Sequence, residues 1–341
     1  MFIWIKIMSK KTNIDKIRPE AEHEIYYKML EKCGILFYKK FNKNFVESDC
    51  PACGSKIKNR AFIKYGFSHY KCDRCLTLFC SPRPMDENLI KYYTEFESAL
   101  YLKQILLKTD VDRKSIQHKP RVDTIVKYLK TFFDKNVLIT ADIGAGTGSF
   151  SKSLKDSNFF NKVIAFDFNK ECVNACKNIG IESYQGSIEQ IEDNSIGLLT
   201  MNDLLEHLSS PFSFVEKCYS KLISNGMIFI STPNGEGFDF KILGKKTVNI
   251  TPPEHLNYFN PKSIQLLMGK AGFKVVKIET PGILDTDIVM REVKNGNINL
   301  SENYKFLQYL LYETSSSTLQ SFQRFLRENL LSSHMFILAQ K

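Results

Sequence analysis

The second half of the chain contains seven short apolar runs, and segments of helical periodicity separate the first five from one another. The runs occupy residues 137–144, 162–168, 181–186, 196–202, 226–234, 273–280 and 333–340. Strands that alternate with helices are joined by crossover connections, so they pair in parallel and helices cover both faces of the sheet. The sequence therefore predicts an α/β fold with a doubly wound parallel sheet.

A glycine-rich turn follows the first run and opens a helix. Asp142 precedes Gly144, Gly146 and Gly148 in a G-x-G-x-G pattern. Glycine lets the backbone approach a ligand closely, and the first turn of a helix offers free N–H groups. A dinucleotide fingerprint would place its third glycine three residues after the second, where this chain has Ser149. The turn predicts a nucleotide-binding loop that departs from the dinucleotide spacing.

A second acidic residue, Asp167, stands near the end of the second run, 19 residues after Gly148. A carboxylate there can accept hydrogen bonds from both hydroxyls of a ribose. Many nucleotide ligands contain a ribose. The position of Asp167 therefore indicates a ribose-containing ligand but does not distinguish one such ligand from another.

The N-terminal part contains two C-x-x-C pairs, Cys50 with Cys53 and Cys72 with Cys75, separated by 18 residues. This spacing is typical of a four-thiolate zinc ribbon, because two residues between ligands let one tight turn aim both sulfurs at a tetrahedral ion. Four thiolates leave no coordination position for water, so the predicted zinc is structural. The alternative is two redox or incidental pairs, although neither pair has a β-α-β context.

The net charge of +10 is distributed unevenly along the 341 residues. Residues 1–136 hold 27 Lys and Arg against 16 Asp and Glu, whereas residues 137–341 hold 20 against 21. A basic half favours an anionic partner such as a nucleotide, a phosphosugar or a nucleic acid, although lysines that serve only solubility have the same signature.

Outside the seven runs, the sequence predicts helices over residues 19–33, ending at Gly34, and over much of 86–133. No apolar run reaches the length of a membrane span. The opening seven residues are too short and too charged for a secretory signal. We therefore expect a cytoplasmic protein, and in that reducing compartment paired thiols favour metal binding over disulfides.

The glycine turn with its preceding Asp142 resembles motif I of the class I S-adenosylmethionine-dependent methyltransferases. The segments 199–212 and 222–234 extend this resemblance to the branch that includes the ubiquinone-pathway O-methyltransferases and many enzymes that methylate sugars. The similarity covers roughly residues 120–281 in order. It implies S-adenosylmethionine as cofactor and a Rossmann-like sheet of seven strands, with the last strand antiparallel beside the sixth.

The resemblance also implies roles for residues around the cofactor. The acidic residue of motif I would contact the methionyl amino end, and Ser187 stands where the family commonly has an acidic residue for the adenine. Ile188 would form an apolar wall. The implied cofactor residues are Asp142, Gly144, Gly146, Gly148, Asp167, Ser187, Ile188 and Asn202.

Two further groups resemble parts of that branch. Asp203, Glu206 and His207 are similar to a divalent-metal site proposed for the ubiquinone-type enzymes, and on one helix they would share a face that could hold Mg²⁺. Alternatively, Asp203 caps a helix and Glu206 is solvated. The loop 252–263 is similar to acceptor-facing loops of sugar-modifying members, which implies His255 as the catalytic base, with His207 as the second candidate. The alternative is that His255 only orders its own loop.

These expectations divide the chain into four segments: an N-terminal helical segment (1–44), a zinc-ribbon module (45–84), a helical linker or lid (85–136) and a class I methyltransferase domain (137–341). The expected function is methyl transfer to a small acceptor, anionic or nucleotide-linked, such as a sugar, a nucleotide sugar or a surface-polysaccharide precursor. One alternative is an RNA methyltransferase that docks RNA on the basic half. Another is a non-enzymatic adaptor.

Overall fold

The structure is a computed structural model that describes residues 13–134, 138–300 and 304–341. A seven-stranded sheet forms its centre, in the order β10-β11-β8-β7-β4-β5-β6. Strand β11 runs antiparallel to both of its neighbours, and the other strands run parallel to one another. The strands are β4 (Ile139–Ile143), β5 (Lys162–Asp167), β6 (Glu182–Gln185), β7 (Ile196–Asn202), β8 (Leu222–Pro233), β10 (Lys274–Glu279) and β11 (His334–Gln340).

All seven predicted runs form strands of this sheet, so the predicted α/β fold is confirmed. The last strand is antiparallel beside β10, as expected, and it lies between β10 and β8. Residues 1–7 and Val137 lie outside the described residues, and the expectations about the first seven residues fall there.

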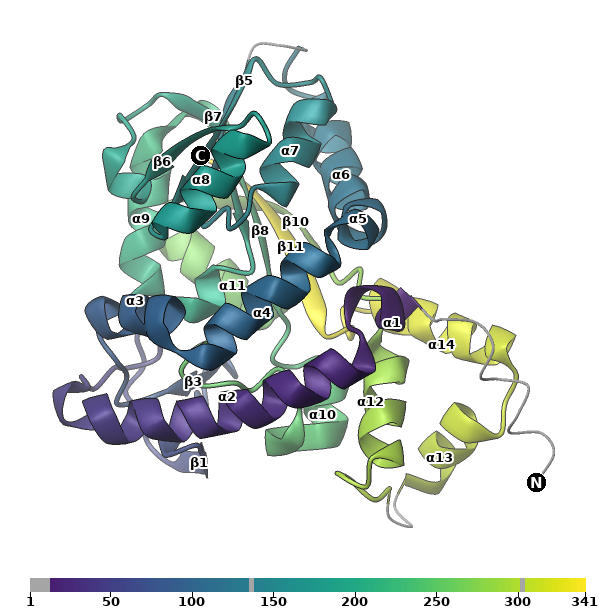
Figure 1. Cartoon of the computed structure of the whole chain (residues 1–341). Helices are drawn as coiled ribbons and strands as arrows, with labels where there is room; N and C mark the ends of the chain where they lie inside the picture. The colour runs from purple at the N-terminus through teal and green to yellow at the C-terminus, as the bar shows by residue number, and fades with distance from the viewer. Residues whose placement is uncertain (1–12, 135–137, 301–303) are drawn as a thin grey trace.

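Neighbouring residues of the central strands enter two separate cores, because successive side chains of a strand point to opposite faces. Leu198 and Phe229 belong to one core, together with side chains of α6 and α7. Leu199 and Ile230 belong to the other, together with side chains of α9 and α11. The helices along the sheet are α6 (Lys119–Leu129), α7 (Ser149–Asp156), α8 (Lys170–Asn178), α9 (Pro211–Lys221) and α11 (Pro261–Lys270). The sheet is thus covered on both faces (Figure 1).

The N-terminal helices lie across one end of this layered unit, where α2 runs beside α4 (Figure 1). The predicted end of the first helix at Gly34 is wrong, because α2 continues to Phe41. Phe37 and Phe41 extend its buried face beyond the glycine. A side chain at Gly34 would come within 2.8 Å of the carbonyl oxygen of Pro252, so the glycine allows close packing instead of ending the helix. The helices of this part are α1 (Asn13–Ile17), α2 (Glu20–Phe41), α3 (Asp86–Glu95), α4 (Glu97–Lys108), α5 (Asp110–Arg113) and the π-helix η2 (Lys114–His118).

A small antiparallel sheet carries the cysteine-rich module, in the order β1-β2-β3-β9. Its first three strands are consecutive, β1 (Arg60–Lys64), β2 (Phe67–Lys71) and β3 (Leu78–Cys80). The fourth, β9 (Asn257–Tyr258), comes from the loop between β8 and α11. The cysteine-rich module and the predicted acceptor loop therefore share one sheet.

Between β8 and that loop lies the short helix α10 (Phe238–Leu243), and between β10 and β11 lie α12 (Asp285–Lys294), α13 (Lys305–Tyr312) and α14 (Ser316–Glu328). Helix α12 packs against α10 and α14. Within the described ranges, none of the helices is long and apolar enough to cross a bilayer.

Candidate functional site

A cavity of about 1500 Å³ opens where β4, β5 and β7 end. Ligands bind at this edge of open α/β sheets, where the connecting loops diverge. The glycine turn after β4 lines one end of the cavity, and the loop 248–255 lines the other together with α12 and α14. The volume exceeds the roughly 300–1,000 Å³ typical of a pocket for one small ligand. Two ligands can therefore occupy it together.

Asp142 is buried near the C-terminal end of β4, where it lines the cavity beside the glycine turn. One of its carboxylate oxygens accepts a hydrogen bond of 2.6 Å from Ser151, and the other accepts one of 2.7 Å from Thr200. Burial raises the pKa of Asp142 to about 6, and the charge of Asp167 acts in the same direction. A cationic ligand group would favour the ionised carboxylate.

The three glycines of the turn all have left-handed backbone conformations, but they meet different surroundings. A side chain at Gly146 would meet no atom within 4 Å, so open space lies above it. A side chain at Gly148 would lie 2.7 Å from the sulfur of Cys176. Gly146 therefore faces the cavity, whereas Gly148 lets α8 pack against the turn.

The predicted ribose residue lies at the end of β5, and its carboxylate is fixed by the backbone. The oxygens of Asp167 accept hydrogen bonds of 2.9 Å from the Gly146 N–H and 2.8 Å from the Asn169 N–H. Each oxygen keeps a lone pair for a ligand hydroxyl. Burial raises the pKa of this carboxyl group as well.

Three other predicted cofactor residues have distinct positions. Ser187 and Asn202 line the cavity, and the side-chain nitrogen of Asn202 is buried without a hydrogen-bond partner among the described residues. Ile188 is fully buried in the main core and does not line the cavity. An unpaired donor beside the glycine turn is a group that a bound ligand would satisfy.

His255 and His207 face each other at the acceptor end, with ring centroids 4.8 Å apart. The Nδ1 atom of His255 lies 2.8 Å from the carbonyl oxygen of Asn249, and Nδ1 of His207 lies 2.6 Å from that of Glu254. A carbonyl accepts only, so Nδ1 of His255 carries the proton and its Nε2 keeps a free lone pair. Burial lowers the pKa of His255 to about 3, and burial also lowers that of His207. Both rings are neutral at physiological pH.

The predicted grouping of Asp203 with Glu206 and His207 on one helix is wrong. Asp203 adopts a left-handed conformation with φ of 50°, and only a single 3₁₀ turn, η4 (Leu205–His207), follows it. Nearly half of the Asp203 side-chain surface, 47%, is exposed, and the charges of His334 and Arg121 lower its pKa to about 2. Its carboxylate lies 3.6 Å from Arg121 and 3.5 Å from His334. Asp203 therefore belongs to a different cluster.

His255 takes the place of Asp203 in the only other group besides the four cysteines that could hold a metal ion within the described residues. Ligand atoms of Glu206, His207 and His255 lie within 4.8 Å of one another. Burial raises the pKa of Glu206 well above its usual value, with the charge of Asp203 adding to the effect, and its Oε1 has no hydrogen-bond partner in the described part of the chain. A divalent ion here would need the same Nε2 lone pairs that a general base uses.

Comparison with known proteins identifies the domain that contains the glycine turn. A family model described as a methyltransferase domain matches residues 117–278. The chain carries a class I S-adenosylmethionine-dependent methyltransferase domain. The prediction of a domain of this class is thereby confirmed.

Similar proteins include the mitochondrial ubiquinone biosynthesis O-methyltransferase of Saccharomyces cerevisiae, which is 27% identical over 152 residues. That match covers 40% of this chain and 49% of the relative, so the methyltransferase chain spans about half of the relative's length. Among solved structures, a methyltransferase from Archaeoglobus fulgidus shares 20% identity with a TM-score of 0.41, covering 64% of this chain and 94% of that one. The YcgJ protein of Bacillus subtilis shares 18% identity with a TM-score of 0.42, covering 66% and 99%.

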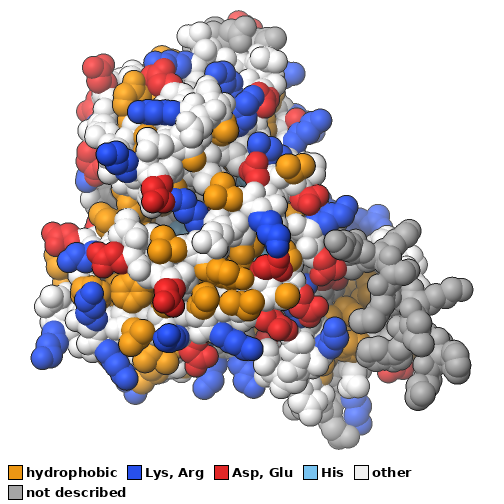
Figure 2. All heavy atoms as spheres, in the orientation of Figure 1, with side chains coloured by type: hydrophobic (Ala, Val, Ile, Leu, Met, Phe, Trp, Pro, Cys, Tyr) orange, Lys and Arg blue, Asp and Glu red, His pale blue; other side chains and the backbone are white. Residues whose placement is uncertain are grey.

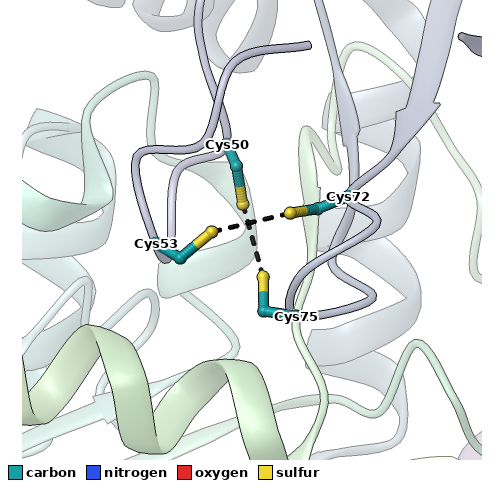
Figure 3. A group of neighbouring side chains, drawn as sticks. All are labelled: Cys50, Cys53, Cys72 and Cys75. Carbon is teal, nitrogen blue, oxygen red and sulfur yellow. Dashed lines mark hydrogen bonds between the residues drawn. The ribbon is translucent and has the colours of Figure 1, made fainter. Parts of the chain in front are cut away.

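The four cysteines of the methyltransferase's N-terminal module converge on one point (Figure 3). Their sulfurs all lie within 4.8 Å of one another, and the pairs Cys50–Cys75 and Cys53–Cys72 are each 3.5 Å apart. Tetrahedral zinc with Zn–S bonds of about 2.3 Å would place sulfurs roughly 3.8 Å apart. The cluster therefore fits such an ion.

Both turns of the cluster have the same backbone geometry. The N–H of Gly54 bonds to the Cys50 carbonyl, and the N–H of Leu76 bonds to the Cys72 carbonyl, each at 2.8 Å. Both residues after the second cysteine of a pair are left-handed, with φ of 75° at Gly54 and 62° at Leu76. Leu76 thus adopts the conformation for which glycine is the usual residue.

Several residues of the methyltransferase site were not predicted as functional. Glu254 is buried and accepts hydrogen bonds from the Tyr26 hydroxyl at 2.5 Å and from the Tyr92 hydroxyl at 3.0 Å. These contacts join α2 and α3 to the loop that bears His255. Only the position of Glu254 directly before His255 could have drawn attention to it, because its partners lie more than 160 residues away in sequence.

Proposed function

We propose that the enzyme methylates a hydroxyl group or an acidic carbon of a sugar, a nucleotide-linked sugar or a surface-polysaccharide precursor, with His255 as the general base. The observation that carries this proposal is the neutral imidazole of His255, whose free Nε2 belongs to a ring on the cavity wall. S-adenosylmethionine would supply an electrophilic methyl group from the glycine-turn end. The protein then needs to hold the acceptor in line and receive its proton.

The loop around His255 supports a positioning role. The Asn249 carbonyl fixes the ring of His255, and the backbone carbonyl of Glu254 fixes the ring of His207. The hydroxyl of Tyr93 lies 2.6 Å from Nδ1 of His207 and adds a second restraint. Both imidazoles are thus oriented before an acceptor binds. His207 is the second candidate for the base because its ring also lines the cavity beside His255.

At the cofactor end, we propose that Asp167 accepts the ribose hydroxyls, that Asp142 stabilises the cationic methionyl end, and that Gly144 and Gly146 make room for the cofactor. Asn202 and Ser187 would complete the set. The unpaired nitrogen of Asn202 and the open space above Gly146 support this arrangement.

For the four cysteines we propose a structural Zn²⁺, because four thiolates close a tetrahedral site. For Glu206, His207 and His255 we favour base chemistry over a bound Mg²⁺, since nitrogen-rich sites suit Mg²⁺ poorly. Full activity in the presence of EDTA would support this choice. Loss of activity that added Mg²⁺ restores would refute it.

A small acceptor also fits the surface better than RNA does. On the face drawn in Figure 2, Lys and Arg side chains are interspersed with Asp and Glu and form no single basic stripe. RNA binding usually has such a footprint.

The experiment that tests the proposal is incubation with methyl-labelled S-adenosylmethionine and cell extract fractionated into nucleotide sugars, lipids, RNA and protein. We expect label in the nucleotide-sugar fraction, and no label there when the His255→Gln variant is used. Label in the RNA fraction that survives moderate salt would replace the sugar proposal by the RNA alternative.

A further inference from the structure

Four arginines line the cavity without a carboxylate partner among the described residues. Arg324 and Arg327 are exposed on α14, whereas Arg18 and Arg113 are only partly exposed. Arg18 lies between α1 and α2, and Arg113 ends α5. In the part of the chain that the structure describes, the arginine ion pairs are those of Arg121 with Asp203 and of Arg291 with Asp15. Neither Arg18 nor Arg113 has a carboxylate oxygen within 4.0 Å in that part. Their charges are therefore not neutralised by the protein itself.

Arg113 is held rigidly by neutral groups. Its guanidinium donates hydrogen bonds of 2.7 Å to the Ile17 carbonyl and 2.9 Å to the Thr109 hydroxyl. A third, of 3.2 Å, goes to the side-chain oxygen of Gln117. Burial lowers the pKa of Arg113 to about 10, with the charge of Arg18 acting in the same direction, so the group stays cationic at neutral pH. A buried cation with only neutral partners is costly unless a counterion joins it.

Arg18 complements this fixed cation. It is half-buried, and its guanidinium has no hydrogen-bond partner among the described residues. Its carbonyl oxygen accepts a hydrogen bond of 3.5 Å from Arg291 of α12, a helix that lines the cavity together with the loop that bears His255. Arg18 is thus a cation that remains available to a ligand.

The acidic groups near these arginines are engaged elsewhere. Asp110 pairs with Lys114 at 2.9 Å. Asp203 pairs with Arg121. Asp285 accepts hydrogen bonds from the Ser332 hydroxyl and the Ser333 N–H. The positive potential at Arg18 and Arg113 is therefore left for a bound group.

We propose that Arg18 and Arg113 form an oxyanion subsite that holds a phosphoryl or carboxylate group of the methyl acceptor near His255. The planar guanidinium fork matches both groups, because each presents oxygens that can accept paired N–H bonds. The proposal rests on the proposed function in one respect, namely that an acceptor occupies this end of the cavity. The volume of about 1500 Å³ leaves room for a charged substituent beside the cofactor.

The test is titration calorimetry on the full chain saturated with S-adenosylhomocysteine, with inorganic pyrophosphate and malonate as probes for the two anion chemistries. We expect at least one probe to bind, and Arg18→Gln to weaken that binding about tenfold or more, as expected for charge-assisted hydrogen bonds. Arg18→Lys should retain part of the affinity. Arg60→Gln, at an exposed position on β1, is the matched control and should bind the probe unchanged.

Two results would overturn the proposal. One is the absence of binding of either probe to the wild type at about 10 mM, well above the millimolar range expected for a small anion. The other is that Arg18→Gln weakens S-adenosylhomocysteine but not 5′-methylthioadenosine, which lacks the carboxylate; the arginine would then hold the cofactor. Neither measurement depends on turnover. The anion subsite can therefore be confirmed even if the protein proves inactive on sugars.

Discussion

The side-chain amide of Asn260 donates a buried hydrogen bond of 2.9 Å to the backbone carbonyl of Cys75. Asn260 also caps α11, accepting hydrogen bonds from the N–H groups of Lys262 and Ser263. The second cysteine turn is thereby tied to the end of the loop that bears His255. The pairing of β9 with β3 continues the same connection.

If the proposed zinc is bound, this connection predicts that its loss impairs the end of the cavity near His255 more than the end near the glycine turn. Replacing Cys50 and Cys53 by Ser should release one equivalent of zinc, because thiolate ligands hold the ion in a folded module. Turnover should fall strongly, while affinity for S-adenosylhomocysteine changes little. Elemental analysis and calorimetry measure the two effects.

The matched control is Cys33→Ser, since Cys33 lies on α2 away from the cluster. It should keep its zinc. A wild-type protein without metal, or a metal-free variant with unchanged turnover, would contradict the account.

Gly146 and Gly148, two of the three glycines of the turn, offer a matched pair of substitutions. Alanine in a left-handed conformation costs about 1–2 kcal/mol at either position. Gly146→Ala should also lose cofactor affinity, because its methyl group enters open space in the cavity. Gly148→Ala should instead lose additional stability, because its methyl group meets the sulfur of Cys176 at 2.7 Å. Thermal unfolding with and without S-adenosylhomocysteine separates the two; the reverse pattern would refute the assignment.

The raised pKa of Asp142 predicts a pH dependence of cofactor binding. The sulfonium and amino groups of S-adenosylmethionine favour the ionised carboxylate, so affinity should weaken as pH falls below about 6, where Asp142 becomes protonated. Calorimetry between about pH 5 and pH 8 measures this. Asp142→Asn should bind weakly at every pH. An affinity that stays constant across that range in the wild type would show that Asp142 does not interact with the cofactor's charge.

The raised pKa of Glu254 predicts that the stability of the folded protein depends on pH. Burial raises its pKa from 4.5 to about 7 in the folded protein. Between these values the folded state binds more protons than the unfolded state, so the contribution of Glu254 to stability falls as pH rises. The contribution lost approaches roughly 3 kcal/mol. Urea unfolding of the wild type and Glu254→Gln at the two ends of that range measures it.

The wild type should lose more stability than Glu254→Gln as pH rises through this window. The comparison removes the opposite effect of the buried histidines, which both proteins share. Equal slopes would show that Glu254 is already ionised in the folded state across the whole range.

Much of the central fold follows from local pattern. The buried runs are bounded by glycine and polar turns, and the seven predicted strands form as expected because each run fits one strand length. The position of β11 between β8 and β10 had no local signal, since strand order depends on how distant segments pack. The role of Gly34 was equally unpredictable from local sequence, because it depends on close packing against the distant Pro252.

The site divides in the same way. The proposed cofactor end of the cavity could be located from sequence because Asp142, Gly146 and Asp167 lie at strand ends in one short segment. The acceptor end was predictable only in part, since the grouping of His207 with His255 depends on a loop that joins another sheet. The proposed subsite of Arg18 and Arg113 combines residues 95 positions apart, and no sequence motif indicates it.

The measurement that tests the central claim most directly is the steady-state rate of methyl transfer from S-adenosylmethionine to the acceptor that the labelling experiment identifies. It compares the wild type with His255→Gln. Loss of a general base costs about 10²–10⁴ in rate. We predict a fall in kcat of that size with affinity for S-adenosylhomocysteine unchanged within about twofold, a free-energy difference well below that of one hydrogen bond. A His255→Gln enzyme with wild-type kcat would contradict the account.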